Sequence, residues 1–510
     1  MSLRLSSFVF ALACVAVCAE PFVDPAPPKV FAVPEQPAPE PQTFDRLTFH
    51  AAPKPLPKDA TTSDWKRLLG PSDNAVSPET HLRHAWPEGG PAKVWEVRKG
   101  EGYTSPAIAE GYLVLFHALE GREVIECLHP ETGRRFWSYD YTISYRDRYG
   151  FANGPRSSPV IGEGTVVTLG VTSMLTCLEL KTGRVLWQRD LRKEFHVPQD
   201  FFGQGGTPLI AEGKVIVNVG GKEAPAPEDD SAARYAALAK PGLCVGAFHL
   251  KTGALAWGVK DTWGASYASP VPATMHGRHV VLVYAGGESN PATGGLLCLD
   301  IHDGTVLSRF PWRDDEYIQA TGSSPVLMPG QNRAFISIAY PKGRPLGGVM
   351  IAWDADFKAT EVWRSAKLAT HWMNAVPHED HLYAIDGETE RVAQLVCFDA
   401  NSGTEKWRED IGWDDPELSP GRTARLGIQR ASLLRVDGKF LVLGELGSLL
   451  WMDLTPDHAK VEARTQLFYA PHTWCLPAVS RGLLYITQNY EEQVRAKSGQ
   501  RLLCYDLRAP

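Results

Sequence analysis

The sequence predicts an all-β fold, an eight-bladed β-propeller with four antiparallel strands in each blade, and three observations predict it. A unit that combines a Ser-Pro or Thr-Pro pair, short apolar strands, a Thr-Gly turn and a tryptophan recurs along the chain. Its copies, each of about 45 to 60 residues, number eight. The last copy ends without an outer strand, and a strand with a tryptophan precedes the first copy.

The second copy contains the whole unit, with Ser158-Pro159, the run TCLELKTG and Trp187. Other copies depart from it, and the seventh is reduced to RASLLRVDGKFLVLGELGSLLWMDL. The fourth has Phe310 where a tryptophan is expected, and the fifth has ADFKAT in place of the Thr-Gly turn. The innermost strands are expected to begin near residues Ser105, Ser158, Thr207, Ser269, Ser324, Asn374, Arg430 and Trp474.

The run VWEV at residues 94–97 is the strand that has no copy of its own. We expect it to complete the last blade, whose sequence stops at LLCYDL. A ring that is closed in this way has no blade with a free lateral edge, which removes a site of uncontrolled strand pairing.

Each part of the unit has a structural reason. Glycine in the turn tolerates a positive φ, and apolar strands suit blades that pack on both faces. The tryptophan is expected to dock between blades, where its burial contributes up to ~4–6 kcal/mol. Cysteines at matching strand positions are expected to be buried thiols without disulfides. They are Cys127, Cys177, Cys244, Cys298, Cys397 and Cys504.

The N-terminus predicts export. Residues 1–19 combine an early arginine, an apolar stretch and a small-residue cleavage site, as a signal peptide does. Cys14 or Cys18 would carry the lipid if cleavage were of the lipoprotein type. Residues 20–63 are rich in proline and predict a disordered linker, and residues 64–510 form the propeller. No later segment approaches the ~20 apolar residues of a membrane span.

Composition and motifs argue against several functions. The formal charge is −7 and no cluster of basic residues occurs, so nucleic acid is not expected as a partner. The sequence has no G-x-S-x-G, H-E-x-x-H or phosphate-cradling glycine loop, which gives hydrolase and nucleotide-binding functions no support. The run HEDH at residues 378–381 is interpreted as a charged hairpin tip rather than a metal site.

The run CLELKTGRVLW resembles the tryptophan-docking repeat of the pyrroloquinoline quinone (PQQ)-type propellers, over residues 64–510. The run WKRLLGPSDNAVSPET resembles the opening of their BamB-like exported members. The resemblance implies a non-enzymatic scaffold, periplasmic or outer-membrane-associated and expected as a monomer, that binds a cell-envelope protein without a cofactor. The alternative it implies is a quinoprotein oxidoreductase that acts on an alcohol or sugar with PQQ and Ca²⁺. The adjacent cysteine pair of such dehydrogenases is missing, which weakens the alternative without excluding it.

A ligand of either kind of protein is expected over the central channel, where the residues just before the innermost strands converge. Arginines there are suited to pair with carboxylates of a planar ligand, and aromatic rings are suited to stack on it. The same side chains would also serve simply to fill the mouth of the channel. No catalytic or metal-binding residue is assigned. The candidate cofactor-binding residues are Arg156, Gln204, Tyr267, Gln319, Trp372, Asn374, Arg430 and Trp474.

Overall fold

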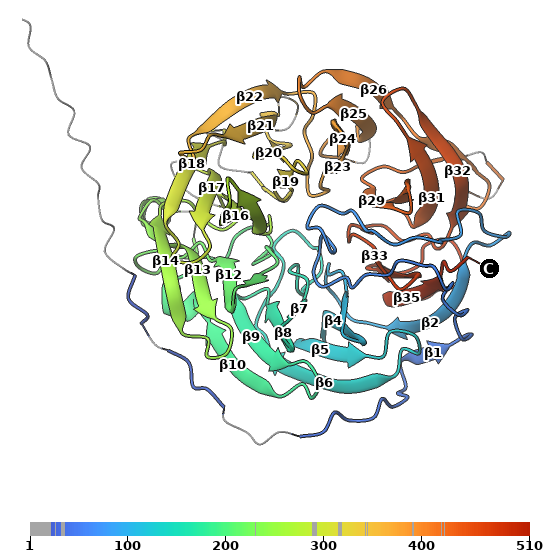
Figure 1. The fold of residues 1–510 in the computed structure, drawn as a ribbon. Helices are drawn as coiled ribbons and strands as arrows, with labels where there is room; N and C mark the ends of the chain where they lie inside the picture. The colour runs from blue at the N-terminus through green and yellow to red at the C-terminus, as the bar shows by residue number, and fades with distance from the viewer. Residues whose placement is uncertain are drawn as a thin grey trace, which may run out of the picture.

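The computed structural model is a ring of eight sheets around a central channel (Figure 1). It describes residues 22–25, 27–31, 36–229, 231–287, 293–314, 319–341, 343, 345–389, 392–419, 421–422 and 424–509. The predicted signal peptide, with Cys14 and Cys18, lies outside the described residues. The prediction of an all-β, eight-bladed propeller is confirmed.

The first four blades are four-stranded antiparallel sheets in which the strands follow chain order from the channel to the rim. Blade 1 contains β3 (Ala107–Ala109), β4 (Tyr112–Leu119), β5 (Arg122–Leu128) and β6 (Arg135–Thr142). Blade 2 contains β7 (Val160–Gly162), β8 (Thr165–Leu169), β9 (Met174–Glu179) and β10 (Val185–Asp190). Blade 3 contains β11 (Leu209–Ala211), β12 (Lys214–Asn218), β13 (Gly242–His249) and β14 (Leu255–Asp261). Blade 4 contains β15 (Val271–Met275), β16 (Arg278–Ala285), β17 (Gly295–Asp300) and β18 (Val306–Pro311).

The next three blades repeat this order. Blade 5 contains β19 (Val326–Leu327), β20 (Arg333–Ile338), β21 (Gly347–Trp353) and β22 (Ala359–Ser365). Blade 6 contains β23 (Val376–His378), β24 (His381–Asp386), β25 (Gln394–Asp399) and β26 (Glu405–Glu409). Blade 7 contains β29 (Ser432–Val436), β30 (Lys439–Leu443), β31 (Ser448–Leu454) and β32 (Ala459–Gln466). A separate hairpin, β27 (Gly412–Asp415) and β28 (Ala424–Gly427), links blades 6 and 7.

The eighth blade joins the two ends of the chain. Its inner strands are β33 (Ala478–Ser480), β34 (Leu483–Gln488) and β35 (Arg501–Asp506), and β2 (Ala92–Arg98) pairs with β35 on the outside. The register sets Trp95 opposite Cys504 and Val97 opposite Leu502. The prediction that residues 94–97 close the ring is therefore confirmed.

Several described residues of the predicted linker lie in ordered contact with the propeller. The strand β1 (Leu47–Phe49) pairs with β2 and adds a fifth strand to the closing blade. Further upstream, Asp24 forms two hydrogen bonds of 2.6 and 3.1 Å with the buried Arg189 of blade 2. Proline restricts backbone pairing but does not prevent an extended chain from lying along a sheet edge. The prediction of a disordered linker is wrong for these residues.

Tryptophans fasten six of the blades to the next. The Nε1 atoms of Trp137 and Trp187 donate to the carbonyl oxygens of Leu180 and Leu250, each at 2.8 Å. The turn glycine lies against the indole, since a Cβ at Gly183 would be 2.4 Å from Cδ2 of Trp137. The predicted docking is thus present, and the same bond to the following blade is made by Trp95, Trp257, Trp363 and Trp407.

The two irregular copies of the unit complement each other. The register places Ser308, and not the predicted Phe310, at the tryptophan position of blade 4, because Ser308 lies opposite Cys298 as Trp187 lies opposite Cys177. Trp353 of blade 5 donates to the hydroxyl of Ser308 at 2.7 Å, and Phe357 occupies the turn position of blade 5 with a φ of 59°. A smaller docking side chain therefore occurs together with a side chain at the turn that glycine normally occupies.

The Ser-Pro and Thr-Pro pairs join the innermost strands around the channel. The hydroxyl of Ser158 accepts a hydrogen bond from the backbone N–H of Ser105 at 3.0 Å. Each such residue accepts the N–H of its counterpart in the preceding blade, so the recurrence of a small hydroxyl has a structural cause. The bonds continue through Thr207, Ser269, Ser324 and Asn374.

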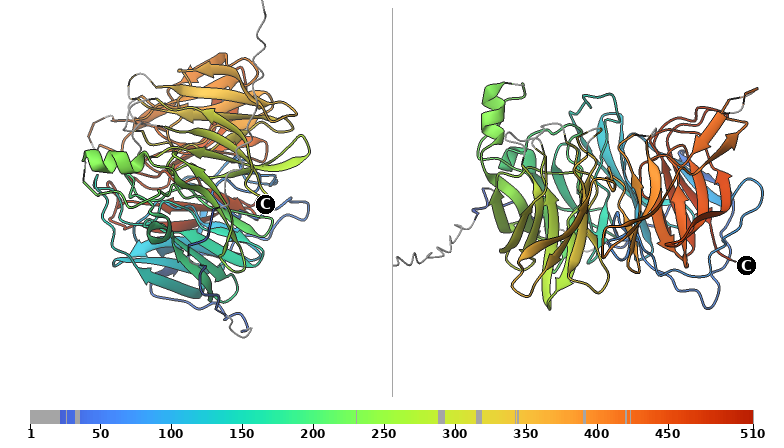
Figure 2. Two further views of the ribbon diagram at one scale, coloured as in Figure 1. Left: turned by 90° about the vertical axis from the view of Figure 1, so that its left-hand side faces the viewer. Right: turned by 90° about the horizontal axis from the view of Figure 1, so that it is seen from above.

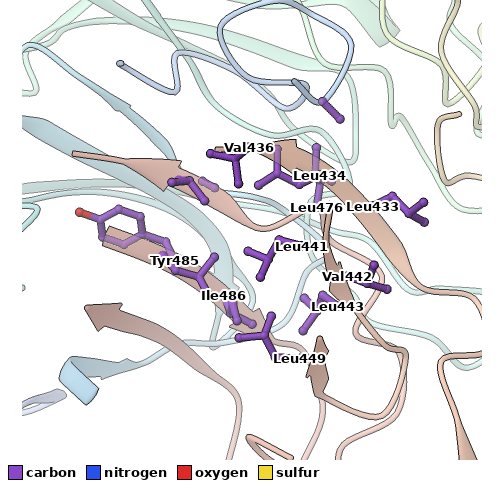
Figure 3. Packing of buried hydrophobic residues seen from close by; sticks show 14 of the residues in the cluster. Leu433, Leu434, Val436, Leu441, Val442, Leu443, Leu449, Leu476, Tyr485 and Ile486 are labelled. Atoms are coloured by element: carbon purple, nitrogen blue, oxygen red, sulfur yellow. The ribbon is translucent and has the colours of Figure 1, made fainter. Parts of the chain in front are cut away.

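Apolar side chains fill the space between blades. Figure 3 shows Leu434 and Leu441 of blade 7 facing Tyr485 and Ile486 of blade 8, all within one buried cluster. The cysteines from Cys127 onward are free and buried, as predicted. Burial raises the pKa of each of these thiols, for example that of Cys177 to about 12, which keeps them protonated and unreactive.

The N-terminal segment before β2 closes one end of the channel (Figure 1, blue). Glu79 accepts hydrogen bonds from the backbone N–H groups of Arg481 and Gly482, at 2.7 and 2.8 Å, in the turn between β33 and β34. Arg67 donates to the carbonyl oxygen of Pro270 at 2.9 Å. The segment therefore spans the channel at the end where the first and second strands of the blades are joined.

The longer insertions lie at the other end, because connections alternate between the two faces of an antiparallel blade. The helix α2 (Ala232–Leu238) stands in the connection between β12 and β13, and Figure 2 shows it in green above one face of the ring. The helix α1 (Leu191–Phe195) precedes the entry to blade 3. In the part of the chain that the structure describes, neither helix approaches the length of a membrane span.

Candidate functional site

A cavity of about 200 Å³ occupies the centre of the ring, where the loops that enter the innermost strands converge. Leu68, Leu69 and Ala75 of the N-terminal segment form its floor. Six aromatic side chains from six different interblade loops form most of its wall. We call them the aromatic funnel: Tyr103, Phe151, Phe202, Tyr267, Trp372 and Trp474.

Trp474 stands at the centre of the aromatic contacts. Its ring centroid lies 4.7 Å from that of Trp372, 5.2 Å from that of Tyr103 and 5.7 Å from that of Phe151. His472 stacks on it at 4.3 Å, with an interplanar angle of 28°. Such short ring separations favour mutual packing, so the funnel wall is a connected aromatic surface.

The contacts continue to the opposite side of the mouth. Phe151 lies 5.7 Å from Phe202, and Phe202 lies 5.8 Å from Tyr267. The hydroxyl of Tyr267 accepts the backbone N–H of Phe202 at 2.9 Å, which fixes the loop that carries the phenylalanine. Tyr149, whose side chain is exposed, packs on Phe202 at 5.3 Å and extends the surface outwards.

Arg430 lies against two tryptophans of the funnel, but its charge is neutralised. Its guanidinium carbon is 5.2 Å from the ring centroid of Trp372 and 5.0 Å from that of Trp474. Both nitrogens on one side bond the carboxylate of Glu445, with Nε to Oε2 at 2.9 Å. Glu445 is 3% exposed and also accepts the Nε1–H of Trp474 at 2.8 Å. The ion pair therefore orients Trp474.

Arg156 is paired in the same way. Its Nη2 donates to Asp147 at 2.8 Å, and both side chains are buried from solvent to nine-tenths or more. Asp147 also accepts the backbone N–H groups of Tyr149 and Phe151, at 2.9 and 3.0 Å. The pair thus shapes the loop that presents Phe151. A charged ligand finds no uncompensated cation at either arginine.

The phenol of Tyr103 stays protonated at neutral pH, because burial raises its pKa to about 12. Its hydroxyl lies 3.4 Å from Nδ1 of His472. With both arginines paired and the phenol neutral, the funnel wall combines apolar rings with groups whose charges cancel.

The sequence-predicted residues are only partly brought together. Five of the eight line the cavity, and Arg430 lies beside it. Gln204 is 5% exposed and donates to the backbone carbonyl of Asn218 at 2.9 Å, away from the cavity wall. Gln319 is 1% exposed and does not line the cavity. The five that line it are Arg156, Tyr267, Trp372, Asn374 and Trp474.

Asn374 has a structural role as well. Its side-chain oxygen accepts the N–H of Ser324 at 3.1 Å, and its amide nitrogen donates to the carbonyl of Ser324 at 3.0 Å. It is the blade-6 member of the ring of interblade bonds. Sequence comparison of the copies already aligns it with Ser158, and that alignment predicts this role better than a ligand contact.

Sequence reasoning did not single out Phe151, Phe202 or Glu445. Both phenylalanines stand in interblade loops ahead of a Ser-Pro or Thr-Pro pair, in FANGPRSSP and FFGQGGTP. Their position in the repeat is the signal that could have identified them. Glu445 follows β30, and nothing in its local sequence points to Arg430. The run at residues 378–381 forms the predicted hairpin tip, with His378 opposite His381.

The fold and its repeat define a class, the PQQ-like propellers with tryptophan-docked blades. A family model described as outer membrane protein assembly factor BamB matches residues 121–409, which is more than half of the chain. The chain belongs to this family.

A solved structure with a TM-score above 0.5 agrees with the fold. Quinohemoprotein alcohol dehydrogenase ADHIIG from Pseudomonas putida HK5 is 11% identical, with a TM-score of 0.53 over 88% of this chain and 81% of that chain. BamB from Moraxella catarrhalis is 12% identical, with a TM-score of 0.48 over 81% of this chain and 97% of that chain. Identities this low show the fold alone. A comparison with curated protein sequences gives no match.

Proposed function

We propose that this protein is a non-enzymatic, exported scaffold of the cell envelope, and that the aromatic funnel binds an apolar or aromatic side chain of a partner protein. The observation that carries the proposal is the connected aromatic wall, in which both arginines are already paired with buried acids. Such a surface gains free energy by excluding water, and aromatic residues are enriched where proteins bind each other.

The size of the cavity supports a protein segment as the occupant. Sites for small molecules and cofactors typically enclose about 300–1,000 Å³, whereas this cavity holds about 200 Å³. A space of this size suits one or two side chains of a partner. Interfaces of this kind derive most of their affinity from a few anchors in desolvated pockets, and Tyr, Trp and Arg are common among such residues.

The loops around the mouth offer additional contact surface. The α2 connection of blade 3 and the β27–β28 hairpin both lie on the face where the funnel opens. Trp413 of this hairpin is half-buried and lies under Arg464, whose guanidinium carbon is 4.3 Å from the ring centroid. An anchor in the funnel together with a rim of loops is the usual anatomy of a protein interface.

A quinoprotein dehydrogenase is the second candidate, and the adjacent rings of Trp372 and Trp474, with centroids 4.7 Å apart, are the observation that favours it. The remaining residues do not fit PQQ with Ca²⁺. PQQ carries three carboxyl groups, but the charges of Arg156 and Arg430 are already paired with Asp147 and Glu445. These two acids are in turn bound to arginine rather than open to a cation. We expect no bound chromophore when PQQ and Ca²⁺ are added to the purified protein.

Family membership and the predicted signal peptide support a periplasmic or outer-membrane-associated location. We expect a monomer there, because the chain closes the ring by itself when β2 pairs with β35.

Site-specific crosslinking in cells tests the proposal. A benzoylphenylalanine at Tyr149, which is exposed at the funnel rim, is expected to capture one defined envelope protein. The same group at Val362, exposed on the outer strand β22, serves as the control position. In the Tyr149 background, Phe202→Ala is expected to lower the crosslink yield at least tenfold, while Val461→Ala, at an exposed position on the outer strand β32, leaves it unchanged.

Two results would overturn the proposal. One is a crosslink pattern at Tyr149 that matches the pattern at Val362, or that persists with Phe202→Ala. The other is a PQQ chromophore that binds with Ca²⁺ and supports dye-linked oxidation of an alcohol or sugar.

A further inference from the structure

On the face opposite the funnel, three side chains from two neighbouring blades converge. Glu212 lies in the turn between β11 and β12 of blade 3, with a φ of 49°. His279 is the second residue of β16, and His302 lies in the turn between β17 and β18, both in blade 4. These turns join first to second strands and third to fourth strands, so all three belong to the face that the funnel does not use.

One carboxylate holds both imidazoles. Oε1 of Glu212 is 2.7 Å from Nδ1 of His279, and Oε2 of Glu212 is 2.7 Å from Nδ1 of His302. The two rings stack with centroids 6.3 Å apart and an interplanar angle of 24°. The donor atoms of all three side chains lie within 4.8 Å of one another. Three potential metal-ligating side chains therefore already lie next to one another.

We propose that Glu212, His279 and His302 form a binding site for a zinc-type divalent metal ion. Two imidazole nitrogens and one carboxylate oxygen are a ligand set that Zn²⁺ accepts, with bonds of about 2.0–2.2 Å. In a tetrahedron with such bonds the ligand atoms are about 3.3–3.5 Å apart. Each imidazole Nδ1 now lies 2.7 Å from a carboxylate oxygen, so it must move by less than one ångström to reach the spacing of a metal site. The fourth position faces solvent and takes water.

The surroundings allow this adjustment and support the ligands. The side chains of His279 and His302 are 58% and 66% exposed, so both rings are free to tilt. Asp300 accepts the backbone N–H of His302 at 2.8 Å and so fixes the turn that carries this ligand. Nε of Arg278 lies 2.9 Å from Oδ2 of Asp300. This ion pair neutralises the positive charge of Arg278.

A metal ion at this position joins two blades. Glu212 belongs to blade 3 and both histidines belong to blade 4, so the bound ion adds a link between them on the face without the funnel. A ligand that binds only the folded state raises the unfolding temperature with its concentration. The site and the funnel can therefore be tested independently.

Calorimetry of the chelator-treated mature protein with ZnCl₂ tests the site. We expect one ion per chain with a dissociation constant in the micromolar range, a rise in the unfolding temperature, and a tetrahedral Co²⁺ absorption spectrum on substitution. His279→Ala and His302→Ala are each expected to weaken binding at least about tenfold. Glu212→Gln, which keeps the size and polarity of the side chain, is expected to do the same.

His458→Ala is the matched control. His458 forms an exposed pair with Asp453 at 3.4 Å but has no second histidine there, so its removal is expected to leave zinc binding unchanged. The three ligand variants replace exposed side chains, and their unfolding temperatures without metal verify that they fold. The proposal fails if the wild-type protein binds no zinc, or if the His279→Ala, His302→Ala double variant binds it with equal stoichiometry and affinity.

Discussion

Substitution of a single turn glycine by alanine should reveal how closely the docked tryptophan approaches the next blade. Gly183 and Gly164 share a φ of 71°, so alanine at either position carries the cost of a left-handed backbone, about 1–2 kcal/mol. A Cβ at Gly164 would meet nothing within 4 Å, whereas a Cβ at Gly183 would lie 2.4 Å from Cδ2 of Trp137. Overpacking of this kind costs about 1–3 kcal/mol more.

Urea unfolding of the two variants measures the difference directly. Gly183→Ala is expected to lower the free energy of unfolding by about 1–3 kcal/mol more than Gly164→Ala does. Ser308 and Phe357 show that a smaller docking side chain occurs together with a side chain at the turn. The double variant Trp137→Phe, Gly183→Ala should therefore lose less than the sum of the single variants. Equal losses at Gly183 and Gly164 would refute the close-approach argument.

Two further predictions concern pH and ring closure. Burial raises the pKa of Glu123 to about 7, so the folded state binds its proton more tightly than the unfolded state. Stability from this group is present at low pH and is lost as pH rises from about 4.5 to 7. Between pH 5 and pH 8 the stability of the wild type relative to Glu123→Gln should fall by about 2–3 kcal/mol, as urea unfolding at each pH will measure. Deletion of residues 20–98 removes β1 and β2, exposes the edge of β35 and should yield aggregated protein by size-exclusion chromatography; deletion of residues 20–44 keeps both strands and should remain monomeric.

Most of the ring could be predicted because its unit is a set of local requirements that repeat. The hydroxyl at the entry to the inner strand, the turn glycine and the tryptophan each meet the same kind of neighbour in most blades. The position of β2 followed from counting strands, since eight copies supplied only seven complete blades. Contacts of this kind depend on the order of residues within the unit and not on the length of the loops between units.

The N-terminal segment shows where that reasoning stops. Its proline content argued against strand pairing within the segment. The strand β1 forms nevertheless, because it needs only the three residues LTF, which contain no proline and pair with the edge of β2. The pairing of Asp24 with Arg189 joins residues 165 positions apart. Neither contact belongs to a repeated unit, so no second copy existed from which it could be inferred.

The funnel forms because neighbouring positions at the entry to each innermost strand have different roles. One position, occupied by Ser158 and its counterparts, bonds the preceding blade and is therefore constrained. The residues immediately before it, such as Arg156 and Tyr267, bond no repeated partner and differ from blade to blade. Sequence reasoning located these variable positions, but it could not tell that Glu445 neutralises Arg430, because that acid lies in a different connection of blade 7. Because of this pairing, residues that resemble an anion-binding site form a largely apolar surface instead. We therefore expect a crosslink to a partner protein and no binding of PQQ in the titration.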